Sequence, residues 1–290
     1  MPEALRLSFL NREFKLALPP PQVFPLVLLT FLAFVALEGY LIYAFRQVSL
    51  EFSFWDLLFW GALLFWSVRV EVHLPLNASV SQLFLFALAL LTLTPPWLAP
   101  LWVFAFQGIG DIWYKTLFNR SQDALSTAAA ALVWIFFQQN PLTLGVWDLS
   151  AGVGSAAASL TFFLVNTNLV SLAIHLTTGA AFKEVWRRNF RWLSLSYFLL
   201  SPIALLLARA YETPLIGGWG GWTVLLFLVP LYYSRYYWDE KVRLEQAFDA
   251  TLEVLMHALE AKEQESRLHS ERVADIAHDL AKALYKDEAK

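Results

Sequence analysis

Long apolar segments alternate with short polar segments through the first 237 residues of the chain. A helix needs about 20 apolar residues to cross the ~30 Å hydrocarbon layer of a membrane, so each long run predicts a membrane-spanning helix. Eight runs are present, at residues 23–45, 54–68, 80–93, 97–113, 124–137, 151–176, 193–210 and 219–237. The pattern predicts an all-α fold, a polytopic membrane bundle of about eight spans. The second, third and fifth runs are short enough that one could be re-entrant.

The positive charges of the connecting segments test this count, because Lys and Arg gather on the cytoplasmic side of a membrane protein. Beginning with the N-terminus inside, every second segment carries basic residues, the largest cluster being Lys183 to Arg191, whereas the outer loops hold only Arg46. An even number of spans with both termini in the cytoplasm satisfies this bias. The first 21 residues form an amphipathic cytoplasmic segment without the features of a cleaved signal peptide.

Beyond Tyr237 the chain changes from apolar to charged without a Gly or Pro to interrupt it. Apolar residues then recur at steps of three and four, which predicts one stripe along a continuous helix that leaves the membrane. The stripe consists of Leu244, Phe248, Leu252, Leu255 and Leu259. It would be exposed in a monomer, so we expect it to pair with a second copy or to pack on a downstream domain.

Composition agrees with a membrane protein and narrows the chemistry. The chain is 58% hydrophobic with a mean hydropathy of +0.51, and it has no cysteine. Disulfides, thiolate catalysis and Cys-ligated metals are thereby excluded. From Trp238 onward 13 acidic residues outnumber 8 basic ones, so no basic surface indicates a nucleic-acid partner.

Polar residues inside the apolar runs, or at their ends, are the candidate ligand contacts of the membrane part. Ionisable groups at such depth are costly and face the bundle interior or a wet cavity. The candidates are Glu38, Gln107, Asp111, Asn119, Gln122, Asn166 and Asn168, and Asp123 and His175 are further polar residues of these segments. Interhelical hydrogen bonding is the alternative use of the same side chains.

The charged C-terminal segment contains one candidate pair of metal ligands. Glu265 and His269 are four residues apart and would share one face of a helix. The adjacent His278 and Asp279 spell a His-Asp dyad, but neighbouring positions on a helix point about 100° apart, and nothing nearby completes a site. His257 is expected on the exposed flank of the helix.

Residues 251–263 and 267–284 resemble the opening of an HD-GYP domain, the family of cyclic di-GMP phosphodiesterases. The resemblance is carried by Ala261-Lys262-Glu263, where the family has Asp as its third residue, and by the stretch His-Ser-Glu-Arg-Val that begins at His269. It implies that Glu265 and His269 belong to a metal site. The rest of that site, a later His-Asp dyad, and the Gly-Tyr-Pro segment would follow Lys290.

The resemblance therefore implies a chain that is cut short before a catalytic core. We expect no cofactor in this chain, and a divalent metal, iron or manganese, only in the complete output domain. Residues 70–82 and 117–126 also resemble, more loosely, the multi-span input modules that precede HD-GYP and diguanylate cyclase domains in bacteria.

These observations predict four parts: a cytoplasmic segment at 1–21, an eight-span membrane sensor at 22–237, a connecting and dimerising helix at 238–268, and the start of the output domain at 269–290. The predicted protein lies in the bacterial inner membrane. Its partners are the lipid bilayer, a second copy of the chain, and an unidentified small-molecule or membrane stimulus.

Two other classes remain open. In a small-molecule-binding or transport protein, the polar residues of the spans would form a substrate site and the tail would be incidental; binding or uptake lost on changing Asn166 or Glu38 would favour this class. A histidine-kinase-like input would use His257 as phosphoacceptor, but the chain contains no ATP-binding region.

Overall fold

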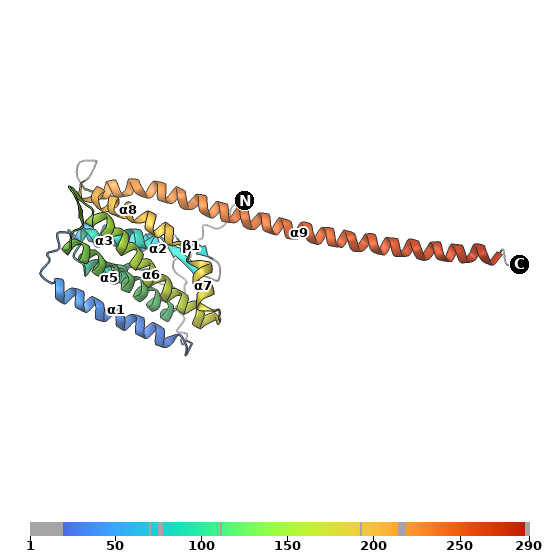
Figure 1. The fold of residues 1–290 in the computed structure, drawn as a ribbon, viewed down its shortest axis with the longest axis horizontal. Helices are drawn as coiled ribbons and strands as arrows, with labels where there is room; N and C mark the ends of the chain where they lie inside the picture. The colour runs from blue at the N-terminus through green and yellow to red at the C-terminus, as the bar shows by residue number, and fades with distance from the viewer. Residues whose placement is uncertain are drawn as a thin grey trace. The chain divides into compact units, whose positions relative to one another are not determined.

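The computed structural model describes residues 20–69, 71–74, 78–108, 110, 112–191, 193–213 and 219–287. Most of residues 1–21 and Asp111 therefore lie outside the described residues. Contacts divide the chain into two compact units, residues 1–229 and 230–290. The described part is mainly helical, as the sequence predicts, and it also contains two short hairpins (Figure 1).

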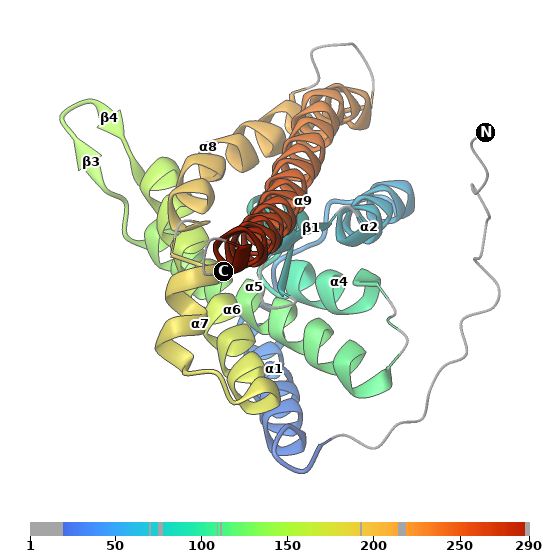
Figure 2. The ribbon, with the colours of Figure 1, turned by 90° about the vertical axis from the view of Figure 1, so that its right-hand side faces the viewer.

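The first unit is a bundle of helices around a buried apolar core. In chain order its helices are α1 (Phe24–Phe45), α2 (Phe54–Arg69), α3 (Leu83–Leu93), α4 (Leu98–Phe106), α5 (Trp113–Gln139), α6 (Ser150–Thr178), α7 (Phe182–Asn189) and α8 (Leu193–Glu212). Helix α5 packs against α1, α3, α4 and α6, and α3 packs against α8 (Figure 2). Every residue of α3 from Leu83 to Leu91 is buried, as expected for a helix that is apolar on all sides.

Two antiparallel hairpins connect helices of the bundle. Strands β1 (Glu71–Leu74) and β2 (Ala78–Ser81) pair with Val72 opposite Val80, between α2 and α3. Strands β3 (Thr143–Leu144) and β4 (Trp147–Asp148) pair between α5 and α6, and Gly145 in their turn has a φ of 61°, which glycine adopts without strain. The sequence did not predict either hairpin.

Small residues allow α6 to approach its neighbours closely. A Cβ atom added at Gly154 would lie 2.9 Å from Cβ of Phe137 on α5. On the side facing α8, Ser159 donates a 2.8 Å hydrogen bond to the backbone oxygen of Tyr197. The alanine- and glycine-rich start of the sixth apolar run thus packs within the chain, and small residues commonly have this use where membrane helices meet.

A proline inside α8 is compensated locally. Pro202 has no N–H to donate to the backbone oxygen of Phe198, four residues earlier. The hydroxyl group of Ser201 donates to that oxygen instead, at 2.9 Å. Such replacement of a lost backbone donor by a serine is common where a helix lies in an apolar environment.

The count of eight spans needs correction. Among the described residues, two helices, α1 and α6, are both long and apolar enough to cross a membrane, and α2 and α3 are shorter apolar helices. The third apolar run is divided because its first residues form β2, and the fourth run stops as a helix at Phe106. At 11 and 9 residues, α3 and α4 would reach only about 16 and 14 Å, too short for one crossing each.

The last helix, α9, extends over Gly221–Asp287 and is 67 residues long. The uninterrupted helix predicted beyond Tyr237 is therefore present. Within the second unit, its apolar stripe is solvent-exposed, with Leu244 at 69% and Leu259 at 63% of the full side-chain exposure. Phe248, Leu252 and Leu255 of the same stripe are exposed as well.

Candidate functional site

The candidate site is built around Asp123, the eleventh residue of α5. This position lies about 15 Å along the helix from its start. Asp123 is only 7% exposed, and it shares a face of α5 with Asn119 and Thr127 because positions four apart lie side by side on a helix. A carboxyl group buried in a membrane bundle marks a functional site by default.

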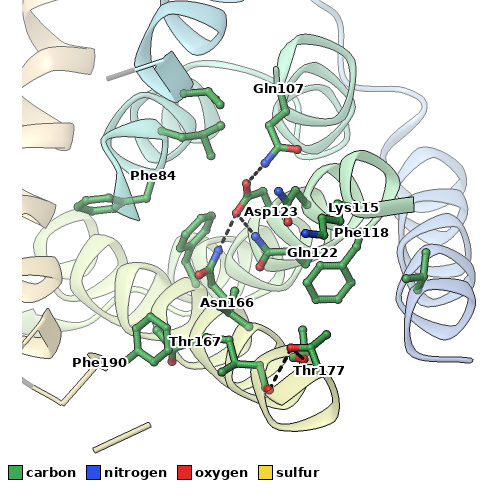
Figure 3. Close-up of a pocket in the computed structure, with 18 of the residues that line it drawn as sticks. Phe84, Gln107, Lys115, Phe118, Gln122, Asp123, Asn166, Thr167, Thr177 and Phe190 are labelled. Atoms are coloured by element: carbon green, nitrogen blue, oxygen red, sulfur yellow. Dashed lines mark hydrogen bonds between the residues drawn. The ribbon is translucent and has the colours of Figure 1, made fainter. Parts of the chain in front are cut away.

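Three amide side chains from three helices donate hydrogen bonds to the Asp123 carboxylate (Figure 3). Asn166 of α6 donates to Oδ1 at 2.6 Å, and Gln122 of α5 donates to the same oxygen at 2.7 Å. Gln107, at the end of α4, donates to Oδ2. The three donors lie 43, 1 and 16 residues from Asp123, so the carboxylate ties α4 and α6 to α5.

The position of Gln107 is fixed by the backbone around it. Its own N–H caps α4 by bonding to the backbone oxygen of Val103, and its backbone oxygen accepts a 2.9 Å hydrogen bond from the Arg120 guanidinium. The hydroxyl of Thr116 accepts from the N–H of Gly110 at 3.0 Å, within the loop between α4 and α5. These contacts turn the Gln107 side chain toward Asp123 (Figure 3).

A pocket of about 500 Å³ opens beside this cluster, and we call it the Asp123 pocket. Its polar lining includes Gln107, Asn119, Gln122, Asp123 and Asn166. The apolar part of the lining comes from aromatic and aliphatic side chains of α1, α3, α5 and α6, among them Val27, Phe84, Phe118 and Phe162. Small-molecule sites in proteins usually have a volume of about 300–1,000 Å³ and a few convergent polar groups, and this pocket has both properties.

The structure gathers four of the seven candidate ligand residues at this pocket: Gln107, Asn119, Gln122 and Asn166. Their role in ligand binding stays a prediction. Asn168 is exposed, and its amide bonds to the backbone oxygen of Leu164 in its own helix. Asp111 lies outside the described residues.

Glu38 lies apart from the pocket, on the buried face of α1. Glu38 is 4% exposed, and within the described part of the chain neither of its carboxyl oxygens has a hydrogen-bond partner. His175 near the end of α6 contacts the backbone oxygen of Ala180 at 2.6 Å, beyond the helix end at Gly179. This contact gives His175 a role in the turn after α6.

Asp123 was not among the candidate ligand residues chosen from the sequence, although it is the acceptor that the three amides share. The sequence signal that points to it is its spacing on α5. It follows Gln122 and lies four residues after Asn119, in a helix whose next two turns are rich in Ala, Ser and Thr. A carboxylate among small residues is a place where neighbouring helices approach closely enough to donate hydrogen bonds.

A second polar cluster, centred on Asp56, also escaped the sequence reasoning. Ser53 and Asp56 form a capping box at the start of α2, in which each side chain accepts from the other residue's N–H, at 2.9 and 3.3 Å. Asp56 also accepts from the hydroxyl of Tyr211 at 2.5 Å and from the indole N–H of Trp219 at 2.9 Å. The cluster thus joins the start of α2 to the end of α8 and to the residues before α9.

The candidate metal pair lies in α9. His269 is exposed, and the backbone of Glu265 belongs to the same helix, whereas its side chain is outside the described part of the structure. Among the described residues, no three His, Asp or Glu side chains are grouped as a metal site would require. The pair can be only part of such a site, and its ligand role stays a prediction.

Comparison with known proteins adds the family. Neither a curated protein nor a solved structure shows significant similarity to the chain. One family model, MASE9, matches residues 16–243, which include the whole helical bundle and the first part of α9. Because this match covers most of the chain, the protein belongs to the MASE9 family of membrane-associated sensory domains.

Proposed function

We propose that this chain is the sensory input region of a bacterial signalling protein whose output is a cyclic di-GMP phosphodiesterase of the HD-GYP type. The observation that carries the proposal is the Asp123 pocket, a ligand-sized space inside a membrane sensory domain. The output class is supported by the Ala-Lys-Glu and His-Ser-Glu-Arg-Val stretches of α9. In that output domain Glu265 and His269 would contribute to an iron or manganese site.

The proposed membrane arrangement follows from helix lengths and charges. Helices α3 and α4 enter and leave on the same side as a re-entrant pair, joined at Pro95 and Pro96. The crossing helices are then α1, α2, α5, α6, α8 and the start of α9. A re-entrant pair leaves an even number of crossings, so both termini stay in the cytoplasm. The basic residues of α7 and of the start of α5 then lie on the cytoplasmic side, in agreement with the distribution of Lys and Arg.

The Asp123 pocket suits signal reception because its polar groups come from three helices. An occupant that bonded to them would favour one packing of α4, α5 and α6 over another. Two packings that differ by only a few kcal/mol are enough for such a response, provided that the ligand binds one of them better. The ligand changes the population of the states and needs no chemistry of its own.

Helix α9 is the proposed transmitter, acting as a homodimer. Its exposed stripe, which includes Leu244, Phe248 and Leu259, has the spacing of a helix-pairing seam. Pairing two stripes would bury apolar surface that a single chain leaves in water. A change in the bundle would then alter how the two helices pair, and the output domain would receive that change.

Helix continuity provides the test. A Gly-Pro pair inserted after Val242 in the full-length protein breaks α9, because glycine and proline are the least favourable residues in a helix interior. We expect cyclic di-GMP hydrolysis by the membrane-embedded protein to become independent of the state of the sensory domain. The matched control is the same insertion after Gly145, in the turn of the β3–β4 hairpin. Regulation that survives the insertion in α9 would overturn the proposal.

A further inference from the structure

Two glutamines of the Asp123 pocket have buried acceptor atoms that no described residue satisfies. The carboxylate of Asp123 accepts only, so it fixes the amide groups of Gln107 and Gln122 with their NH₂ ends toward it. The carbonyl oxygens of the two amides therefore point elsewhere. Both Oε1 atoms are buried and have no hydrogen-bond partner among the described residues, and the two glutamines are 6% and 5% exposed.

A buried acceptor without a donor is unfavourable, and native structures rarely retain two in one cluster. Both glutamines line the pocket, and a rotation of either amide would bring its Oε1 atom to a ligand there, which can supply the missing N–H group. The buried charge of the lining is the Asp123 carboxylate, which favours a cation, whereas the Arg120 guanidinium does not line the pocket and bonds to the backbone oxygen of Gln107. Lys115 also lines the pocket, but its side chain is exposed and its charge is screened by water.

The remaining walls define the rest of the ligand. Phe84, Phe118 and Phe162 line the pocket together with aliphatic side chains. Aromatic rings bind apolar bodies through their faces and edges, and they also attract cations. The combination calls for an ammonium group with N–H donors, attached to a compact apolar body.

We infer that the Asp123 pocket binds a primary or secondary amine, whose protonated nitrogen donates to Gln107 and Gln122 beside the Asp123 carboxylate. This inference rests on the proposed sensory function and names the ligand class of its pocket. Two sources could present such a group: a free amine, or the headgroup of an aminophospholipid such as phosphatidylethanolamine. The chemistry that recognises the group is the same for both.

The test uses the full chain in nanodiscs of phosphatidylcholine, whose quaternary ammonium has no N–H donor. Isothermal titration at pH 7 measures the binding of 2-phenylethylamine, 2-phenylethanol and trimethyl(2-phenylethyl)ammonium. We expect the amine to bind at least tenfold more tightly than the alcohol, which lacks the charge, and than the trimethyl compound, which lacks the donors. Equal affinity for all three probes, or no binding of the amine, would overturn the inference.

Two variants locate the bound amine. Asp123→Asn removes the charge with little change in shape, and Gln122→Leu removes one unpaired acceptor; each should weaken amine binding at least tenfold. The matched control is Gln138→Leu, since Gln138 is exposed on the same helix, and its affinity should equal that of the unaltered chain. Circular dichroism verifies that each variant is folded. Unchanged amine binding in both pocket variants would contradict the assignment of the amine to this pocket. If neither variant folds, the comparison of the three probes on the unaltered chain still tests the inference.

Nanodiscs that contain phosphatidylethanolamine distinguish the sources. A lipid headgroup that occupies the pocket would compete, so amine affinity should fall at least tenfold; unchanged affinity assigns the pocket to a free amine. No output domain is needed for these measurements. If the binding measurements fail, the inferred ligand class is wrong, but the helix-insertion test of the proposed function is unaffected. If the helix-insertion test fails instead, amine binding to the pocket is unaffected.

Discussion

The hydrogen bond between Asn166 and Asp123 should be the main polar link between α6 and α5. Asn166→Leu removes the donor and keeps a side chain of similar size, so packing is little disturbed. The lost bond is 2.6 Å long and ends on a carboxylate. Hydrogen bonds to charged groups contribute about 1.5–3 kcal/mol in water-soluble proteins, and bonds between membrane helices contribute about 0.6–1.7 kcal/mol.

The structure places the expected effect near the top of the membrane range. Asp123 is almost fully buried, so water does not replace the lost donor, but Gln107 and Gln122 continue to bond to the carboxylate. We therefore expect a loss of about 1.5 kcal/mol, close to a tenfold change in the folding equilibrium. Reversible unfolding in mixed micelles, followed by the fluorescence of the 13 tryptophans, measures this change.

Asn168→Leu is the matched control, two residues away on the same helix. Asn168 is exposed, and its amide bonds to the backbone oxygen of Leu164 within α6. A surface substitution of this kind should change the free energy of unfolding by less than about 0.5 kcal/mol. Equal losses in the two variants would refute the reasoning. So would a loss at Asn166 that remains full-sized in an Asp123→Ala background, because the two residues would then be energetically independent.

Two further substitutions test other contacts of the bundle. Gly154→Ala forces α6 away from α5 and should destabilise the bundle by about 1–3 kcal/mol, whereas Gly152→Ala, with open space around its added Cβ, should be neutral or slightly stabilising in the same unfolding assay. Tyr211→Phe removes the hydrogen bond to Asp56 and should cost about 1 kcal/mol, while Tyr40→Phe, at an exposed position of α1, should cost nothing measurable; equal effects would contradict the role of the Asp56 cluster.

Residues with a strong local signal were predictable from the sequence. The apolar runs at residues 23–45 and 151–176 correspond closely to α1 and α6, because an unbroken run of that length has few alternatives to a helix in a membrane. The apolar stripe of α9 was predictable for the same reason, since its period of three to four residues is itself the helical repeat.

The division of the third and fourth runs was not predictable from hydropathy. Ala78–Ser81 is apolar enough to extend a span, but it pairs as β2 with a strand that precedes it, and pairing is a tertiary effect. Likewise α4 stops at Phe106, since Gln107 leaves helical conformation, and the Gln107 side chain bonds to Asp123. A hydropathy scale sums the contributions of single residues, so it does not account for either of these tertiary contacts.

Most polar residues of the candidate site were predictable from the sequence, but Asp123, the acceptor at its centre, was not chosen as a ligand residue. Their positions inside apolar runs or at the ends of these runs identified Gln107, Gln122 and Asn166, but which carboxylate they share depends on how α4, α5 and α6 pack. Asp56 shows the same limit. Its partners Tyr211 and Trp219 are 155 and 163 residues away in the chain, and both read as ordinary aromatic residues near the ends of spans.

Pulsed electron spin resonance on α9 tests the central claim, that the state of the Asp123 pocket is transmitted to a paired output helix. Because the chain has no cysteine, Glu260→Cys introduces a single labelling site on α9. In nanodiscs, the account predicts a defined distance between the labels of two copies. It also predicts that Asp123→Asn shifts this distance and that Gln138→Leu does not. The absence of a distance between copies, or identical distributions in the unaltered chain and the Asp123→Asn variant, would contradict the account.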